Sequence, residues 1–234
     1  MRKVPSMLIK AVLLSCYFFC INKDAAAQNF GYSFQRDSSS YADLAGPAVL
    51  LSNETFINKH PVIHLPFSFN FCGYNTDSVI IETNGFIVFN AYYPLSLISF
   101  NAFGGNKDSL QHYIASVNYN SSGTSGNRIL KIEFKDLSMN GYNYYDRLSY
   151  QVWLYENGNK IEYHVGPNSY SCWEEGLPQL LGPINQNMST ANNAFLISGD
   201  PNNPTGELIS SEEELSYINN VPAEGTIYTL TPTF

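Results

Sequence analysis

The most constraining feature of this sequence is the alternation of phenylalanines in the segment FSFNF. Phe67, Phe69 and Phe71 are separated by the polar residues Ser68 and Asn70. Successive side chains of a β-strand point to opposite faces, so a period of two places the three rings on one face. A helix, with a period of 3.6 residues, would scatter them around its surface. The segment therefore predicts a strand with one face in a hydrophobic core.

Two more strands are predicted directly after this one. Gly73-Tyr74-Asn75 predicts a turn, and Val79 and Ile81 then share one face of the next segment. An apolar run resumes at 86–89 after Asn84-Gly85. Asn-Gly between two such runs is typical of a tight hairpin, because a type I′ turn needs positive φ at both central residues. We therefore predict three consecutive antiparallel strands that share a phenylalanine-rich face.

The rest of the chain repeats this pattern of short apolar or alternating runs separated by turn residues. The sequence has 17 tyrosines and 15 phenylalanines, whereas charged residues make up only 14%. This composition favours strands over helices. We predict about ten to twelve strands in one all-β domain, an antiparallel β-sandwich or jelly roll over residues 28–234. The further strand candidates lie at 32–35, 47–51, 62–71, 113–119, 129–134, 148–154, 161–165, 180–184, 194–197 and 226–231.

Several local features carry predictions of their own. Pro66 within the first strand indicates a sheet edge or a bulge, since proline cannot donate to the ladder. Asn157-Gly158 predicts a second hairpin. Residues 91–109 contain Pro94 and Gly104-Gly105 and are expected to form a connection with little regular structure. Residues 210–217 (SSEEELSY) predict one helical turn.

The first 27 residues predict a cleaved export signal. Arg2 and Lys3 precede a mostly apolar run at 7–21, and Ala25-Ala26-Ala27 matches a small-residue cleavage site. The run is short for a membrane span, which needs about 20 apolar residues. A lipoprotein anchored through Cys16 is an alternative, since LLSC resembles an acylation motif. Either route predicts an exported protein, located outside the cell, on its surface or in a periplasm.

The charge balance excludes two classes of partner. The chain has a formal net charge of −8, which becomes −11 when residues 1–27 are removed. Nucleic acids and anionic membrane surfaces attract positively charged proteins. We therefore expect neither nucleic acid nor membrane insertion of the mature chain.

Cleavage of the leader would leave two of the four cysteines, Cys72 and Cys172. In an oxidising compartment the two thiols are candidates for a disulfide. Closing so long a loop stabilises the folded state by about 4–5 kcal/mol in the chain-entropy interpretation. The alternative is two separate thiols, because the sequence does not show that their Cα atoms come close enough to pair.

The sequence contains no established catalytic motif. The zinc-protease, nucleophile-elbow and phosphate-loop patterns are all absent, and the four histidines lack the spacing of metal ligands. His164 is expected on the outward side of its strand. No catalytic residue and no cofactor are therefore predicted. A weak calcium hypothesis comes from Asp200, Asn202 and Glu207, whose oxygen atoms suit Ca²⁺, although an ordinary turn explains the same residues.

Aromatic residues in two loops are the candidate ligand-binding residues. One loop holds Tyr142, Tyr144 and Tyr145, and the other holds Tyr170 and Trp173. Amphipathic rings beside amides and carboxylates can stack on sugars or anchor a protein partner. The alternative is that these rings cover one end of the core.

The order of the motifs resembles a known family. A YSF strand, the run HLPFSFNFCGYNTDSVIIETNGFIVF, the strand ILKIEFKDL, the hairpin SYQVWLYENGNKIEYHVG and a final GTIYTLTP follow one another over residues 30–232. This order is similar to a β-sandwich module of exported Bacteroidetes proteins and resembles the nidogen-like extracellular domain. The resemblance implies an exported sandwich and supplies no catalytic residues. The acidic, tryptophan-containing segment that this module often carries has no counterpart in 113–120.

These observations together predict a secreted or surface-associated binding or adhesion protein without enzymatic activity, whose ligand is a glycan or a cell-surface protein. One alternative is a structural surface protein that acts through protein contacts only. Another is an extracellular polysaccharide hydrolase, which would need two facing carboxylates from among Asp136, Asp146, Glu174 and Glu175.

Overall fold

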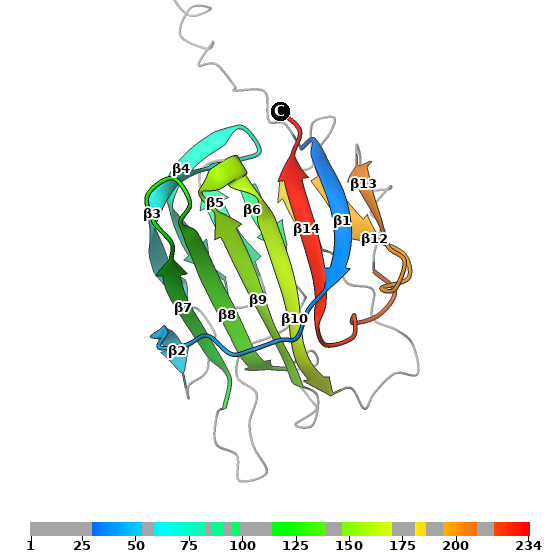
Figure 1. Cartoon of the computed structure of the whole chain (residues 1–234), viewed down its shortest axis with the longest axis horizontal. Helices are drawn as coiled ribbons and strands as arrows, with labels where there is room; N and C mark the ends of the chain where they lie inside the picture. Colours follow the sequence, from blue (N-terminus) through cyan, green and yellow to red (C-terminus); the bar gives the residue numbers. More distant parts are fainter. Residues whose placement is uncertain are drawn as a thin grey trace, which may run out of the picture.

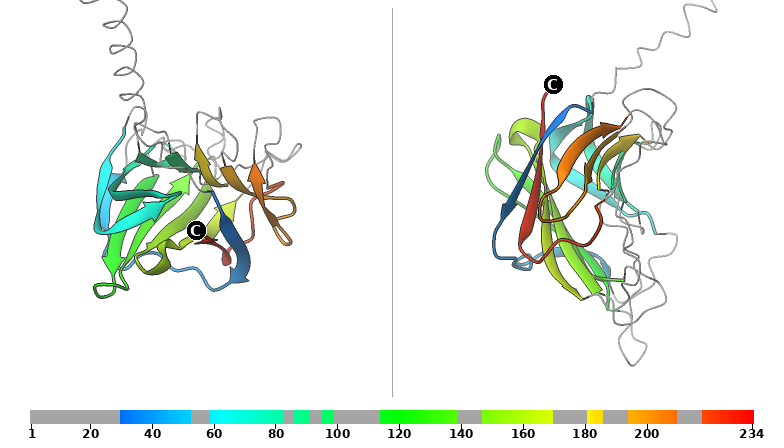
Figure 2. Two further views of the ribbon diagram at one scale, coloured as in Figure 1. Left: turned by 90° about the horizontal axis from the view of Figure 1, so that it is seen from above. Right: turned by 90° about the vertical axis from the view of Figure 1, so that its right-hand side faces the viewer.

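The computed structural model describes residues 30–52, 59–82, 86–90, 95–98, 114–138, 147–169, 181–185, 194–209 and 218–234. These residues form fourteen strands in two antiparallel sheets of seven, which face each other as a sandwich (Figures 1 and 2). Within these ranges the one helical element is a short 3-10 turn, η1 (Asn157–Asn159). No helix among the described residues has the length and hydropathy that a membrane crossing requires. The predicted all-β sandwich is confirmed.

The strands of the first layer, sheet A, are, in spatial order, β1 (Tyr32–Ser38), β14 (Thr226–Pro232), β10 (Ile161–Ser169), β9 (Arg147–Tyr155), β8 (Ile129–Leu137), β7 (Ser116–Ser122) and β2 (Ala48–Ser52). Those of sheet B are β13 (Thr205–Ile209), β12 (Ala194–Ser198), β11 (Gly182–Asn185), β6 (Leu95–Ile98), β5 (Phe86–Asn90), β4 (Tyr74–Ile81) and β3 (Val62–Phe71). Chain neighbours often pair, but β1 pairs with β14 and β2 with β7.

The core between the sheets is dominated by rings. Phe69 and Phe71 on β3 are fully buried, and the ring of Phe71 stacks on that of Phe89, with centroids 3.9 Å apart. Sheet A contributes Tyr150 and Tyr163, which are also fully buried. Burying an aromatic side chain of this size stabilises a fold by about 1.5–3 kcal/mol before the entropy cost of ordering it. The phenylalanine-rich face predicted from the sequence is therefore confirmed as core.

Both predicted hairpin pairings are also confirmed. β3, β4 and β5 pair antiparallel in chain order, and so do β9 and β10. At the second hairpin Gly158 has φ +75°, a value that residues with a Cβ rarely adopt. The Asn84-Gly85 turn itself lies outside the described residues. The first turn is shifted by one residue, because Cys72 and Gly73 have positive φ and Tyr74 already begins β4.

Two predictions about strands need correction. Residues 91–109 are expected to form a connection with little regular structure, and within them the structure has the short strand β6, which pairs with β5 on one side and β11 on the other. The strand β13 was not predicted either, so the fourteen described strands exceed the expected ten to twelve. Both are short, with four and five residues. Such segments contain too few residues to show the two-residue alternation of apolar and polar side chains. They are strands because neighbouring strands supply their hydrogen bonds.

The ladder between β3 and β4 is split in the middle. The register pairs His64 with Ser78 and then Phe69 with Thr76, so four residues of β3 lie opposite a single residue of β4. Pro66 lies inside this interruption, and β3 is the edge strand of sheet B. Both readings of Pro66, a sheet edge and a bulge, are confirmed. Arg128, which directly precedes β8, donates to the Pro66 carbonyl, and this carbonyl therefore has a partner outside the β3–β4 ladder.

The connection from β1 to β2 crosses the outer face of sheet A (Figure 1). We call residues 39–47 of this connection the strap. It passes over β10, β9, β8 and β7, and thereby covers side chains that a two-layer sandwich would otherwise expose to solvent. Its contacts define one of the polar clusters described next.

Candidate functional site

Clusters of polar side chains lie outside the core, and three of them, among the described residues, are candidates for a functional site. One lies beneath the strap, one on the outer face of β9 and β10, and one around a groove on the outer face of sheet B. A polar group that already has its hydrogen-bonding partners holds the fold together, whereas one without partners is available to a ligand. We therefore compare the three clusters by the partners that each side chain has.

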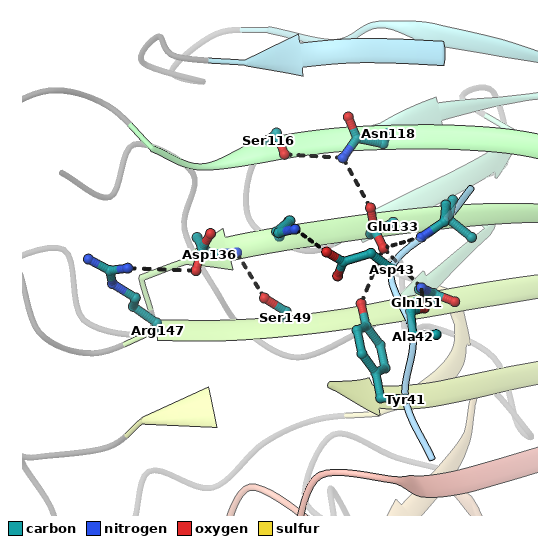
Figure 3. A network of polar contacts seen from close by, with 12 residues as sticks. Tyr41, Ala42, Asp43, Ser116, Asn118, Glu133, Asp136, Arg147, Ser149 and Gln151 are labelled. Carbon is teal, nitrogen blue, oxygen red and sulfur yellow. Dashed lines mark hydrogen bonds and ion pairs between the residues drawn. The ribbon is translucent and has the colours of Figure 1, made fainter. Parts of the chain in front are cut away.

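Glu133 on β8 is the centre of the cluster beneath the strap (Figure 3). Its side chain is outward-facing but only 2% exposed, because the strap lies over it. The register aligns it in one row with Gln151 on β9 and Asn118 on β7. Gln151 Nε2 donates to Oε1 at 2.9 Å, and Asn118 Nδ2 donates to Oε2 at 3.1 Å.

The strap itself completes the shell around this carboxylate. The Leu44 backbone N–H donates to Glu133 Oε1 at 3.0 Å, and the Tyr41 hydroxyl donates to the same oxygen at 3.4 Å. Gln151 Nε2 also donates to the Ala42 carbonyl at 2.9 Å. Both oxygens of Glu133 therefore have partners, and the cluster fixes the strap to the sheet without leaving an unpaired group for a ligand.

Close packing beneath the strap depends on a glycine. A Cβ at Gly166 would lie 2.6 Å from Cζ of Tyr41 and 2.9 Å from the carbonyl oxygen of Ser149. Both separations are shorter than a van der Waals contact. The absence of a side chain at Gly166 leaves room for the Tyr41 ring, whose hydroxyl reaches Glu133.

Asp136 marks the end of this cluster and was a candidate carboxylate for the hydrolase alternative. It has φ +53° at an irregularity in the β8–β9 pairing, and its N–H donates to Ser149 Oγ at 3.1 Å. Its carboxylate lies 4.0 Å from the Arg147 guanidinium. The other candidates, Asp146, Glu174 and Glu175, lie outside the described residues.

The second cluster surrounds Trp153 on β9. The Lys131 ammonium lies 3.7 Å from the centroid of the indole ring, and the His164 ring stacks on the indole at 3.9 Å. Lys131 belongs to β8 and His164 to β10, the two neighbours of β9, so they approach the indole from opposite sides. Both faces of the ring are therefore occupied, and neither is free to stack on a sugar.

Glu162 satisfies the remaining polar groups of this cluster. It accepts hydrogen bonds from the Tyr155 hydroxyl at 2.6 Å and Lys160 Nζ at 2.7 Å, and it pairs with His164 Nε2 at 2.9 Å. Burial on its own raises the pKa of Glu162, but these three hydrogen bonds outweigh burial and lower the pKa to about 2. His164 is therefore an outward-facing, hydrogen-bonded histidine, as predicted.

The third cluster lines a groove of about 530 Å³ on the outer face of β3, β4 and β5. The split in the β3–β4 ladder lies along this groove. At this split a side chain of β4 itself pairs with backbone groups of the strand. The Thr76 hydroxyl donates to the Ser78 carbonyl at 2.7 Å and accepts from the Ser78 N–H at 3.2 Å. The residues that line the groove include Ser68, Tyr74, Asp77, Ser78, Ile80 and Val88.

This groove differs from the other two clusters in its unpaired groups. Within the described part of the chain, no hydrogen bond or ion pair engages the side-chain oxygens of Ser68, Tyr74, Asp77 or Ser78. The Tyr74 side chain is 38% exposed and has no ring partner among the described residues. Among the described residues, an aromatic ring, three hydroxyls and a carboxylate on neighbouring strands therefore have no protein partner.

The structure tests few of the predicted site residues. Tyr142, Tyr144, Tyr145, Tyr170 and Trp173 all lie outside the described residues, as does the helical turn expected at 210–217.

The cysteine and calcium hypotheses also remain predictions. Cys72 is a free thiol, 1% exposed, with Sγ 3.6 Å from the Tyr32 hydroxyl, whereas Cys172 lies outside the described residues. Asp200 accepts from the N–H of Asn202, and Glu207 accepts from the Thr205 hydroxyl. The described residues contain no group of three histidine, cysteine or acidic side chains that could hold a metal ion.

Sequence reasoning missed the groove because it assigned Tyr74 to a turn and treated the first hairpin only as core. One usable signal was present, since a proline within a strand marks the position where a ladder is interrupted. What the sequence could not supply was the register of β3 and β4, which leaves Ser68 and Asp77 unpaired within the interruption of the ladder.

Comparison with known proteins agrees with the fold. The sequence model of a family described as NIDO related matches residues 31–232. No curated protein and no solved structure matches the chain. The match spans both sheets from β1 to β14, and it includes the hairpins that carried the nidogen-like resemblance. This chain, a sandwich whose outer face bears a groove with unpaired polar groups, therefore belongs to the NIDO-related family.

Proposed function

We propose that this protein is a non-enzymatic binding module of an exported or surface-associated protein, and that the groove on β3, β4 and β5 holds its ligand. The observation that carries the proposal is the contrast between clusters. Glu133 and Glu162 are surrounded by partners, whereas Tyr74, Asp77 and the two serines of the groove have none among the described residues.

The position of the groove on a rigid scaffold supports this role. Val79 and Ile81, which alternate with Ser78 and Ile80 of the groove along β4, are each 1% exposed in the core. A ligand would therefore meet side chains whose backbone is already fixed, which lowers the entropy cost of binding. The ligand is a glycan or a cell-surface protein, and export through the leader at 1–27 brings the module to it.

A binding screen with matched variants tests the proposal. The purified protein is applied to an array of glycans and of immobilised extracellular proteins. At least one ligand is expected whose binding is lost in Tyr74→Ala and kept in Leu208→Ala. Leu208 is a suitable control because its side chain is 49% exposed on β13, at the opposite edge of the same sheet.

Two results would contradict the proposal. The first is an array on which every bound ligand is retained equally by wild type and Tyr74→Ala. The second is hydrolysis of an extracellular polysaccharide by the purified protein, which would replace the binding module with the hydrolase alternative. Thermal melting of both variants verifies that the substitutions leave the sandwich folded.

A further inference from the structure

We infer that the ligand of the groove is a neutral saccharide, a step that rests on the proposed function and adds the chemical class of the ligand. Four features of the lining point to it: its charge, the kind of hydrogen-bonding groups that it offers, its exposed ring and its size.

The charge of the lining excludes acidic ligands. Asp77 is its one charged side chain, and the lining contains no lysine, arginine or histidine among the described residues. His64 pairs with Ser78 across the ladder but does not line the groove. The whole chain adds a net charge of −8. A phosphate, sulfate or uronate would meet like charge here without a cationic partner, which raises its cost of desolvation.

The hydrogen-bonding groups match a polyol. The hydroxyls of Ser68 and Ser78 can each donate and accept, whereas the Asp77 carboxylate only accepts. A sugar carries neighbouring hydroxyls that can donate to one carboxylate and accept from serine hydroxyls at the same time. Hydrogen bonds to an ionised carboxylate are about twice as strong as those between neutral groups, so Asp77 is the expected anchor.

Tyr74 provides the apolar half of the site. Unlike Trp153, whose two ring faces are occupied, Tyr74 has no stacking partner among the described residues. The C–H face of a pyranose can pack on an exposed aromatic ring, while its hydroxyls point toward the polar rim. Half-buried Ile80 and Val88 extend the apolar surface beside it. The volume of about 530 Å³ lies within the range of about 300–1,000 Å³ typical of small-ligand sites.

Calorimetric titration of the purified protein tests this ligand class. The probes are hexasaccharides of β-1,4-glucose, β-1,4-xylose, β-1,4-mannose and β-1,3-glucose, an oligogalacturonate and an oligolysine peptide. At least one neutral probe is expected to bind. Tyr74→Ala weakens that binding about ten-fold and Asp77→Asn about five-fold or more. Tyr74→Phe, which keeps the ring, and Leu208→Ala, which lies far from the groove, change it less than about three-fold.

The other outcomes separate the two levels of the proposal. Binding of oligogalacturonate or oligolysine but of no neutral probe, with the same dependence on Tyr74, overturns the saccharide inference and leaves the binding module standing. Neutral binding that Tyr74→Ala and Asp77→Asn leave unchanged overturns the assignment to this groove. If none of these probes binds and the array yields no Tyr74-dependent ligand, both the ligand class and the proposed function fail.

Discussion

Replacing Glu133 tests how the strap is held to sheet A. In Glu133→Ala four donors lose a charged acceptor: the Leu44 N–H at 3.0 Å, Gln151 Nε2 at 2.9 Å, Asn118 Nδ2 at 3.1 Å and the Tyr41 hydroxyl at 3.4 Å. Gln151 keeps the Ala42 carbonyl and Asn118 keeps the Ser116 hydroxyl, whereas the Leu44 N–H and the Tyr41 hydroxyl lose the acceptor that Glu133 gave them.

The expected loss of stability follows from these four groups. Leaving the partly buried Leu44 N–H without an acceptor costs about 1–3 kcal/mol, each of the two partly satisfied amides adds about 1 kcal/mol, and the long hydrogen bond of Tyr41 adds little. Removing the carboxylate also relieves its own desolvation, so the net loss is about 2–4 kcal/mol. Glu133→Gln keeps the shape and one acceptor oxygen, and it should cost about 1 kcal/mol because its new amide group faces the donor of Asn118.

Two measurements check this prediction. Urea unfolding gives the free energy difference, and hydrogen exchange reports the protection of the Leu44 amide in the strap. The matched control is Asp43→Ala, which removes only an exposed ion pair with Lys135 at the strap and should cost less than about 1 kcal/mol. Glu133 does not hold the strap if Glu133→Ala is no more destabilising than Asp43→Ala and leaves the hydrogen exchange of the Leu44 amide unchanged.

Three further predictions follow from individual contacts. Gly166→Ala should destabilise the protein by about 1–3 kcal/mol in chemical denaturation, because its Cβ would lie 2.6 Å from Tyr41, and the loss should be smaller in a Tyr41→Ala background. The pKa of Glu162 is lowered from 4.5 to about 2, so its contribution to stability is present above pH 4.5 and is lost as the pH falls toward 2. The contribution is about 3 kcal/mol at most and about 1–2 kcal/mol after solvent screening. The free energies of unfolding of wild type and Glu162→Gln, measured as the pH is lowered, should converge by this amount. Curves that stay parallel would contradict the prediction. Burial raises the pKa of the Cys72 thiol, so iodoacetamide should label this thiol only after unfolding. A disulfide-linked Cys72–Cys172 peptide, found by mass spectrometry without reductant, would instead establish the predicted disulfide.

The sequence alone determined the fold class and the main hairpins, because their signals are local. The alternation of Phe67, Phe69 and Phe71 follows from the two-residue period of a strand alone. The turn at Gly158 is indicated by a glycine at a position that needs a positive φ angle. These features predicted an all-β sandwich and the inward face of its core. The short strand β6 had no such signal, since its pairing with β5 and β11 comes from distant parts of the chain.

Only the tertiary structure decided which polar residues have partners. In the sequence Glu133 is an outward-facing residue between two apolar neighbours, and nothing there indicates that the strap will cover it. Tyr74 and Asp77 likewise become part of a groove only because the β3–β4 ladder splits beside them. Hydrogen-bond satisfaction depends on atoms far apart in the chain, so it follows from the order of strands in the sheet rather than from the local pattern of residues.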